Sequence, residues 1–133
     1  MPIAIAISED SAPLMVQDEV ALHAALRQAE DSANACGRLG VITLTASNGN
    51  EMTLVVGGPE TALGFVHDHC DPPYYASAGQ SDAEEPVLTA YYLLGHHTEF
   101  PRYSVITMAL GAKAAEQFLA TSDLPSCVQW REA

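Results

Sequence analysis

Two strand-forming runs around a tight turn constrain the fold of this chain more than any other segment. Residues 40–58 read GVITLTASNGNEMTLVVGG, with β-branched and large apolar side chains on both sides of Asn48-Gly49. An Asn-Gly dipeptide readily supplies the two positive φ angles of a two-residue hairpin turn. The sequence therefore predicts a β-hairpin here, and with it a sheet built from antiparallel strands.

Two amphipathic helices are predicted, one before this hairpin and one after it. The first runs from Asp18, which caps it, to about Ala33, and the second runs from the capping residue Thr107 to Thr121. Apolar residues recur in both at the spacing of one helix face. They are Leu22, Ala25, Leu26 and Ala29 in the first helix, and Leu110, Ala114, Ala115, Phe118 and Leu119 in the second. Each helix is thus expected to pack one face on the sheet.

The remaining segments predict short strands and one long loop. The expected strands are 3–7, 63–68, 87–95, 98–100 and 128–130. Asp71–Pro86 is expected to be a loop, since it contains Pro72-Pro73 and Gly79. A chain of 133 residues fits one domain, 1–133. The predicted fold class is α+β, with a mainly antiparallel twisted sheet packed with two principal helices in a single domain.

The charge of the chain limits the partners it can bind. Seventeen acidic residues and five basic residues give a formal net charge of −12. Such a surface repels nucleic acids and anionic membranes, and it attracts basic partners. Solubility alone is the other explanation of this acidity. We expect a basic protein partner, no nucleic acid and no membrane.

Several features indicate a cytoplasmic protein. The chain has no apolar stretch of about 18 residues, as a membrane span requires. Its first residues, MPIAIAISED, lack the basic region of a signal peptide. Cys36, Cys70 and Cys127 are odd in number and show no CxxC spacing, so we expect free thiols in a reducing compartment.

A run of potential metal ligands occupies residues 67–71, which read HDHCD. On a strand, His67, His69 and Asp71 would share one face, so a three-ligand zinc site is geometrically possible. The other interpretation is a polar strand end that runs into Pro72. Because no second ligand pair stands at a recognised spacing, we expect no metal and no cofactor.

Catalytic signatures are incomplete. His97-Thr98-Glu99 matches the first half of the zinc deaminase motif. No cysteine follows Pro125 directly and only Cys127 is present in that region, so the second half is missing. The chain has no GxSxG motif, P-loop or GxGxxG motif. We therefore expect a protein without enzymatic activity. The alternative is a small metal-binding or enzymatic domain, centred on His67, His69, Cys70, His96 and His97.

The second half of the chain carries an ordered set of features that resembles a known family. The set comprises Pro72–Gly79, Val87–Tyr92 with Gly95, Thr98–Pro101, the helix 112–121, Leu124-Pro125 and Trp130 with Glu132. It resembles the first-named family of immunity proteins in bacterial polymorphic toxin systems. The ending, in which Pro125 and Trp130 follow Thr121 at fixed distances, is its most specific part. Members often have a glycine after this threonine, where the chain has Ser122-Asp123.

The resemblance implies a function and a partner. Such immunity proteins often neighbour toxins of the deaminase superfamily, including DNA cytosine deaminases. It implies that the chain binds a cognate toxin with a basic substrate cleft and neutralises it by occluding that cleft. We expect the free protein to be a monomer.

The residues expected to contact the toxin are acidic or aromatic. The acidic cluster of the predicted loop, with two tyrosines before it, is the main candidate. The full set is Asp68, Asp71, Tyr74, Tyr75, Asp82, Glu84, Glu85 and Glu99. For each carboxylate the alternative is a solvated surface position, and for each tyrosine it is a place in the core.

The only tryptophan lies in the last predicted strand. If that strand pairs with the sheet, Trp130 packs as a core residue and fixes the end of the chain against the helix that carries Phe118. The alternative is that Trp130 is an exposed anchor for the toxin, since tryptophan is enriched at interface hot spots. We expect Trp130 and Phe118 to have structural roles.

Overall fold

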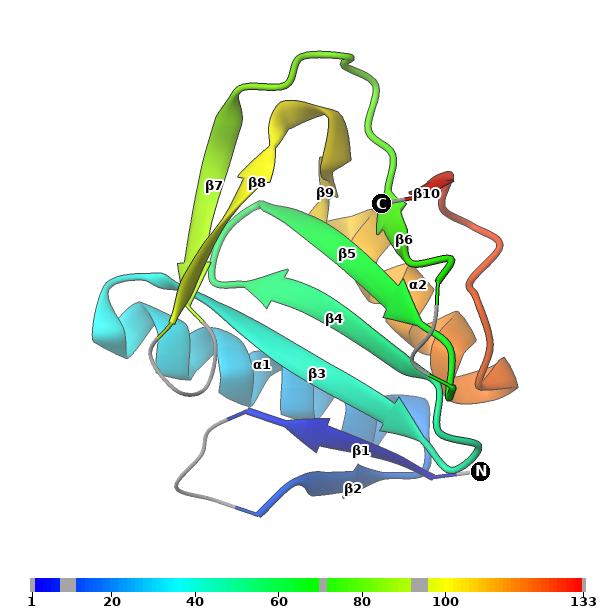
Figure 1. Ribbon diagram of the computed structural model, residues 1–133. Coiled ribbons are helices and arrows are strands. Elements are labelled where there is room, and N and C mark those ends of the chain that lie inside the picture. Colours follow the sequence, from blue (N-terminus) through cyan, green and yellow to red (C-terminus); the bar gives the residue numbers. More distant parts are fainter. Residues whose placement is uncertain (1, 8–11, 70–71, 92–95, 133) are drawn as a thin grey trace.

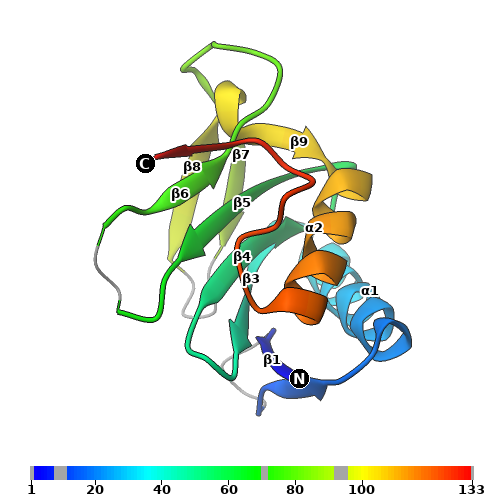
Figure 2. The ribbon, with the colours of Figure 1, turned by 90° about the vertical axis from the view of Figure 1, so that its right-hand side faces the viewer.

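A computed structural model describes residues 2–7, 12–69, 72–91 and 96–132 of the chain. Within these residues, two α-helices pack on one face of a ten-stranded, mainly antiparallel sheet (Figure 1). Seen from the side, both helices lie on the same side of the strands (Figure 2). The predicted α+β class with two principal helices is confirmed.

The main path of the sheet runs in the order β10-β6-β5-β4-β3-β1-β2. These strands are β1 (Ile3–Ala6), β2 (Leu14–Val16), β3 (Leu39–Ala46), β4 (Glu51–Val56), β5 (Glu60–Val66), β6 (Tyr75–Ser77) and β10 (Trp130–Glu132). Every pair of neighbours on this path is antiparallel. The predicted hairpin is β3–β4, but its turn is not the expected two-residue type. Gly49 has a φ of 95° and Asn48 has no positive φ, and the N–H of Ala46 donates to the carbonyl of Asn50.

Three further strands leave this path. β7 (Pro86–Tyr91) and β8 (His97–Pro101) form an antiparallel pair, here called the β7–β8 arm, which rises away from the main path (Figure 1). The arm joins the sheet through a short parallel pairing of β7 with β3. A 3₁₀ helix, η1 (Arg102–Ser104), then leads into β9 (Val105–Thr107), which pairs with β5.

Both predicted helix starts are confirmed by their caps. Asp18 accepts a hydrogen bond from the backbone of the first turn of α1 (Glu19–Cys36), and Thr107 does the same for α2 (Met108–Thr121). α1 continues past its predicted end and stops at Gly37, which adopts the left-handed conformation. Neither helix is long and apolar enough to cross a membrane.

The main core lies between the helices and one face of the sheet. Its largest fully buried side chains are Phe65, Phe118, Ile3, Ile5, Leu22, Ile42, Leu44, Met52, Leu54 and Leu63. A second, smaller cluster lies on the opposite face, where the β7–β8 arm covers one end of the sheet. It consists of Val41, Val55, Ala62 and Ala90, with Leu39 and Phe100 packed against them.

The sequence prediction missed three short strands, β2, β6 and β9, and misplaced a fourth. The predicted loop is wrong at β6, because Tyr75 and Ala76 pair with β5. The last strand begins at Trp130 instead of Val128, which is buried just before it. Strands of three residues carry too few side chains for a periodic signal, so their partner strands determine them. Residues 92–95 of another predicted strand lie outside the described residues.

Ser122 links the end of α2 to the turn of the β3–β4 hairpin. Its carbonyl accepts hydrogen bonds from the side-chain amides of Asn48, at 3.0 Å, and of Asn50, at 2.9 Å. Ser122 adopts a φ of 58°, in the left-handed region that favours glycine. This conformation explains why a glycine suits the position.

Trp130 is half-buried and packs against the main core. Its ring lies 6.3 Å from that of Phe65, and Phe65 in turn lies 6.2 Å from Phe118. The indole Nε1 donates a hydrogen bond of 2.8 Å to the carbonyl oxygen of Pro125. Trp130 therefore connects the last strand to the helix of Phe118 through Phe65, without a direct ring contact.

Truncating either ring is expected to lower the free energy of unfolding. Phe118 is fully buried, so Phe118→Ala should cost about 4 kcal/mol, and the half-buried Trp130 should cost about 3 kcal/mol as Trp130→Ala. Urea denaturation measures both. Val20→Ala is the control, because Val20 is 82% exposed and its loss should be small. A loss at Phe118 no larger than at Val20 would contradict its place in the core.

Replacing Ser122 by glycine is expected to stabilise the protein. Ser122→Gly removes the steric cost of the left-handed conformation and should raise the free energy of unfolding by about 1 kcal/mol. The matched control is Ser126→Gly, since Ser126 is exposed and has no positive φ. Thermal unfolding of both variants measures the difference. An equal or greater gain at Ser126 would show that the φ of Ser122 is not the cause.

Candidate functional site

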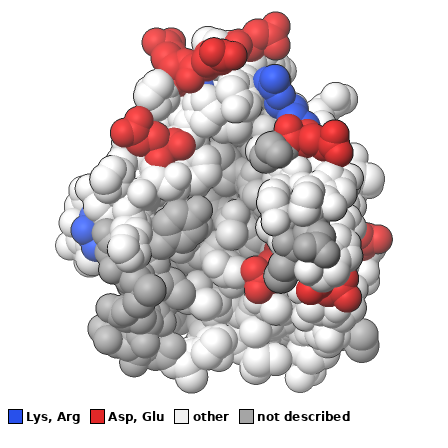
Figure 3. Space-filling model, in the orientation of Figure 1, with Lys and Arg blue, Asp and Glu red and all other residues white. Residues whose placement is uncertain are grey.

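The candidate site is the acidic loop, residues 78–85, which joins β6 to β7. Three of the carboxylates that the sequence analysis selected, Asp82, Glu84 and Glu85, are exposed on it. In Figure 1 this loop crosses the top of the molecule, and Figure 3 shows acidic side chains gathered there. The structure therefore brings these three predicted contact residues together on one exposed segment.

Hydrogen bonds to η1 and its surroundings hold the acidic loop in place. The backbone N–H of Gly79 donates to the carbonyl of Tyr103 at 2.6 Å, and the N–H of Tyr103 donates to the carbonyl of Ala83 at 3.0 Å. The N–H of Arg102 donates to the carbonyl of Glu85 at 2.9 Å. These bonds use backbone atoms only. The loop is thus ordered independently of its acidic side chains, which stay available for a partner.

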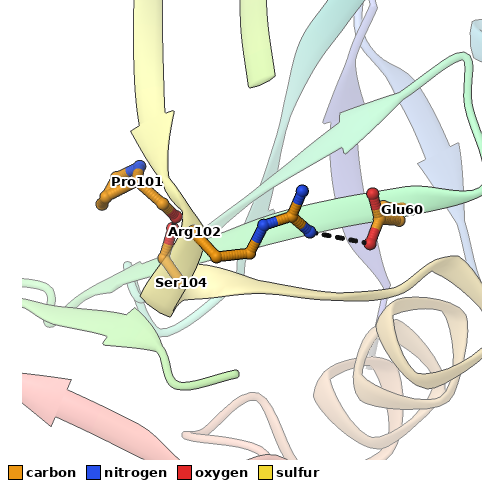
Figure 4. A network of polar contacts seen from close by, with 4 residues as sticks. All are labelled: Glu60, Pro101, Arg102 and Ser104. Carbon is orange, nitrogen blue, oxygen red and sulfur yellow. Dashed lines mark hydrogen bonds and ion pairs between the residues drawn. The ribbon is translucent and has the colours of Figure 1, made fainter. Parts of the chain in front are cut away.

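The side chain of Arg102 is engaged within the protein. Its Nη1 lies 3.3 Å from Oε2 of Glu60, and the Oγ of Ser104 donates to the carbonyl of Pro101 at 2.9 Å (Figure 4). Both partners of the ion pair are partly exposed, so the pair orients η1 and adds little to stability. The positive charge beside the acidic loop is in this way directed toward Glu60.

Two more arginines lie over aromatic rings. The guanidinium of Arg131 lies 4.1 Å from the ring centre of Tyr103, and that of Arg38 lies 4.1 Å from the ring centre of Tyr91. With Arg102, three of the five basic residues of the chain interact with its own surface. The acidic residues consequently dominate the charge that a partner meets.

The other predicted acidic contacts lie away from the acidic loop. Asp68 is exposed beyond the end of β5, beside Gly49 of the β3–β4 turn, and its N–H donates to Oδ1 of Asn50 at 3.0 Å. Glu99 is exposed on β8 of the β7–β8 arm. Asp71 lies outside the described residues. The structure thus places Asp68 and Glu99 apart from the acidic loop.

The two predicted tyrosine contacts differ in exposure. Tyr74 is 39% exposed, whereas Tyr75 is half-buried on β6 and packs its ring edge-on against His67, with 6.1 Å between centres. Tyr75 also packs against the main core. Tyr74 is therefore the more accessible of the two to a partner.

The histidines of the alternative metal site lie in two separate places. The rings of His67 and His69 stack with 5.6 Å between their centres, while His97 lies on the β7–β8 arm with its ring 5.8 Å from that of Tyr91. Cys70 and Asp71 lie outside the described residues. In the part of the chain that the structure describes, no three side chains of metal-binding type form a group that could hold an ion.

The two described cysteines are free thiols. Cys36 is exposed at the end of α1, and Cys127 is half-buried after α2. Burial raises the pKa of the Cys127 thiol above its ordinary value, which keeps it protonated and weakly nucleophilic at neutral pH. Cys127 therefore fills space beside the core. The third cysteine, Cys70, lies outside the described residues.

Comparison with known families covers nearly the whole chain. The family model of the immunity protein Imm1 matches residues 6–132, from the end of β1 to the end of β10. The chain belongs to the Imm1 family of immunity proteins. No curated protein matches it. The resemblance that the second half indicated thus extends over the first half too.

Membership of the Imm1 family implies that the chain has a toxin partner. An immunity protein acts on a cognate toxin, so the surface of this Imm1 chain includes the area that contacts that toxin. The acidic loop is the exposed segment with the highest density of carboxylates among the predicted contacts.

The residues that position the acidic loop could not be predicted from the sequence. Gly79, Arg102 and Tyr103 act through backbone atoms, which leave no side-chain signature. A Cβ at Gly79 would collide with the carbonyl oxygen of Val105, so this position requires glycine. Gly79 itself was the only signal of this contact in the sequence, and the sequence analysis interpreted it only as evidence for a loop.

Gly79→Ala is expected to loosen the acidic loop. The added methyl group would force the loop away from β9, at a cost of about 1–3 kcal/mol in the free energy of unfolding. Amide hydrogen exchange should become faster at Tyr103 and Arg102, whose N–H groups bond the loop. Ala78→Gly, one residue earlier, is the control. Unchanged exchange in Gly79→Ala would contradict the described contact.

Proposed function

We propose that this immunity protein neutralises a toxin of the nucleic-acid deaminase type by covering its substrate cleft. The observation that carries the proposal is the acidic loop, in which three exposed carboxylates stand on a segment held by backbone hydrogen bonds. A toxin that modifies a nucleic acid needs a basic cleft to bind the phosphate backbone. Carboxylates placed there would occupy the positions of the phosphates.

The electrostatics of the whole chain support this proposal. The net charge of −12 attracts a basic surface over a distance and raises the rate of encounter. At physiological ionic strength this attraction acts over a Debye length of about 8–10 Å. Exposed carboxylates on a projecting loop are well placed to act within that range.

Apolar and aromatic contact is expected to set the lifetime of the complex. Rim charges act mainly on association, whereas desolvated aromatic side chains act on dissociation. Tyr74, on the segment before β6, is the aromatic candidate because it is the more exposed of the two tyrosines. Tyr75, packed on His67, is a weaker candidate.

The proposal also covers the way in which the chain acts. It acts by stoichiometric binding, without catalysis, as a monomer in the cytoplasm of the cell that makes the toxin. Family membership supports this mode of action, since immunity consists in neutralising a partner. The acidic surface supports a protein partner and argues against nucleic acids and anionic membranes as partners.

Neutralising the acidic loop is expected to slow association. The triple variant Asp82→Asn, Glu84→Gln, Glu85→Gln keeps the backbone bonds of the loop, because they use carbonyl and N–H groups. Association with the cognate toxin domain should fall about tenfold at low salt, with dissociation nearly constant. Surface plasmon resonance at two salt concentrations measures both rates.

The matched control removes the same charge elsewhere. Glu19→Gln, Glu30→Gln, Asp31→Asn changes three carboxylates on α1, on the helix side of the sheet. It should slow association much less than the loop variant. Equal effects would show that net charge alone steers the toxin. If the wild-type chain binds the toxin domain but leaves its deamination of a cytosine-containing oligonucleotide unchanged, the proposed occlusion is wrong.

A further inference from the structure

Among the described residues, the face of the sheet opposite the helices is covered only at its end near Val41 and Val55, by Phe100 and Ala90 of the β7–β8 arm. Along the rest of β1, β3, β4, β5 and β6, alternate side chains point away from the helices. We call this uncovered area the open face. Ile3 and Ile5 are fully buried on the helix side, and Ala4 and Ala6 between and after them belong to the open face.

Strand register arranges the open face in two rows. In the first row the neighbours across the strands are Ala6, Thr43, Thr53, Gly64, Ala76 and Arg131. In the second row they are Met15, Ala4, Thr45, Glu51 and Val66. The centre of the open face is thus made of alanine, threonine and glycine. The two charged residues lie toward its borders, Glu51 at the start of β4 and Arg131 on the last strand.

The composition of this face is unusual for a sheet surface in water. The solvated face of an antiparallel sheet usually alternates with long polar or charged side chains. Here the central side chains are small and only half-buried, and Met15 at the border is 62% exposed. Protein interfaces have this arrangement, with few charges at the centre and a polar rim.

The rim of the open face is mainly acidic, although Arg131 on the last strand also borders it. Figure 3 views this face and shows a hollow in its middle, with acidic side chains along the top and toward the right. The exposed carboxylates on the segments around it are Asp68, Asp82, Glu84, Glu85, Glu99 and Glu132. The acidic loop is therefore one part of a longer border around a neutral floor.

We propose that the open face is the central docking surface for the toxin, with the acidic loop as one side of its rim. This inference rests on the proposed function for its partner, and it assigns the contact area. The occupant is the basic, convex border of the toxin's substrate cleft, because an acidic rim complements positive charge and a hollow floor of small side chains accepts a protrusion. A second copy of this chain would instead place two like-charged rims in contact.

Filling the hollow tests the proposal. Thr43→Tyr and Thr53→Tyr each place a ring in the middle of the floor, at strand positions where aromatic residues are favourable. Each should weaken binding to a catalytically inactive form of the cognate deaminase-type toxin domain by about 30-fold or more. Isothermal titration calorimetry measures the affinity, and thermal unfolding verifies the fold.

The matched control places the same ring on the other side of the molecule. Gln28→Tyr changes an exposed position of α1 and should leave the affinity unchanged. If both floor variants bind as the wild type does, the open face is not the docking surface, while the proposed function stands. If the wild-type chain does not bind the toxin domain, the proposed function fails, and the inference with it. Wild-type dimers that the floor variants dissociate would assign the face to self-association and overturn the proposal.

Oxidation of methionine tests the same surface in the unmodified protein. Met15 borders the open face, whereas Met108 lies at the start of α2, in a groove between the helices. Bound toxin should protect Met15 from hydrogen peroxide several-fold and leave Met108 unchanged, as mass spectrometry of the peptides would show. This readout decides the question even if a floor variant fails to fold. Equal protection of both residues, or of neither, would contradict the proposal.

Discussion

The alternation of side chains along β3 and β4 is the constraint on which the rest of the structure depends. On one side, Ile42, Leu44 and Leu54 are buried beneath the helices, and this burial is the main source of stability. On the other side, Thr43 and Thr53 face outward by the same alternation. A shift of one residue in register would exchange the two sets. The apolar core therefore fixes which side chains the protein presents to a partner.

The sequence alone was sufficient to predict the elements whose structure depends on neighbouring residues. Asn48-Gly49 predicted the hairpin, and Asp18 and Thr107 predicted the helix starts, because turns and caps depend on neighbouring residues. The strands β6 and β9 could not be predicted, since each is three residues long and exists through its pairing with β5. Such pairings bring together residues far apart in the chain, and no local pattern encodes them.

The candidate site was predictable to a similar extent. The sequence itself shows that Asp82, Glu84 and Glu85 stand close together, and the structure places all three on one exposed loop. The difference between Tyr74 and Tyr75 could not be predicted, because it depends on which residue enters the ladder of β6. The open face was also missed. Its threonines and alanines, with Gly64, come from five strands, and only the complete register brings them together.

Strand β10 is the last element of the chain, and this position affects when the sheet of a newly made molecule is complete. It pairs with β6, more than fifty residues earlier in the chain, and it supplies Arg131 to the border of the open face. Topologies with many such distant pairings fold in about milliseconds to seconds, more slowly than helical bundles. Newly made chains consequently pass through a period in which the open face, the proposed docking surface, is unfinished. On that proposal, a cell that makes the toxin is protected only by immunity protein that folded beforehand.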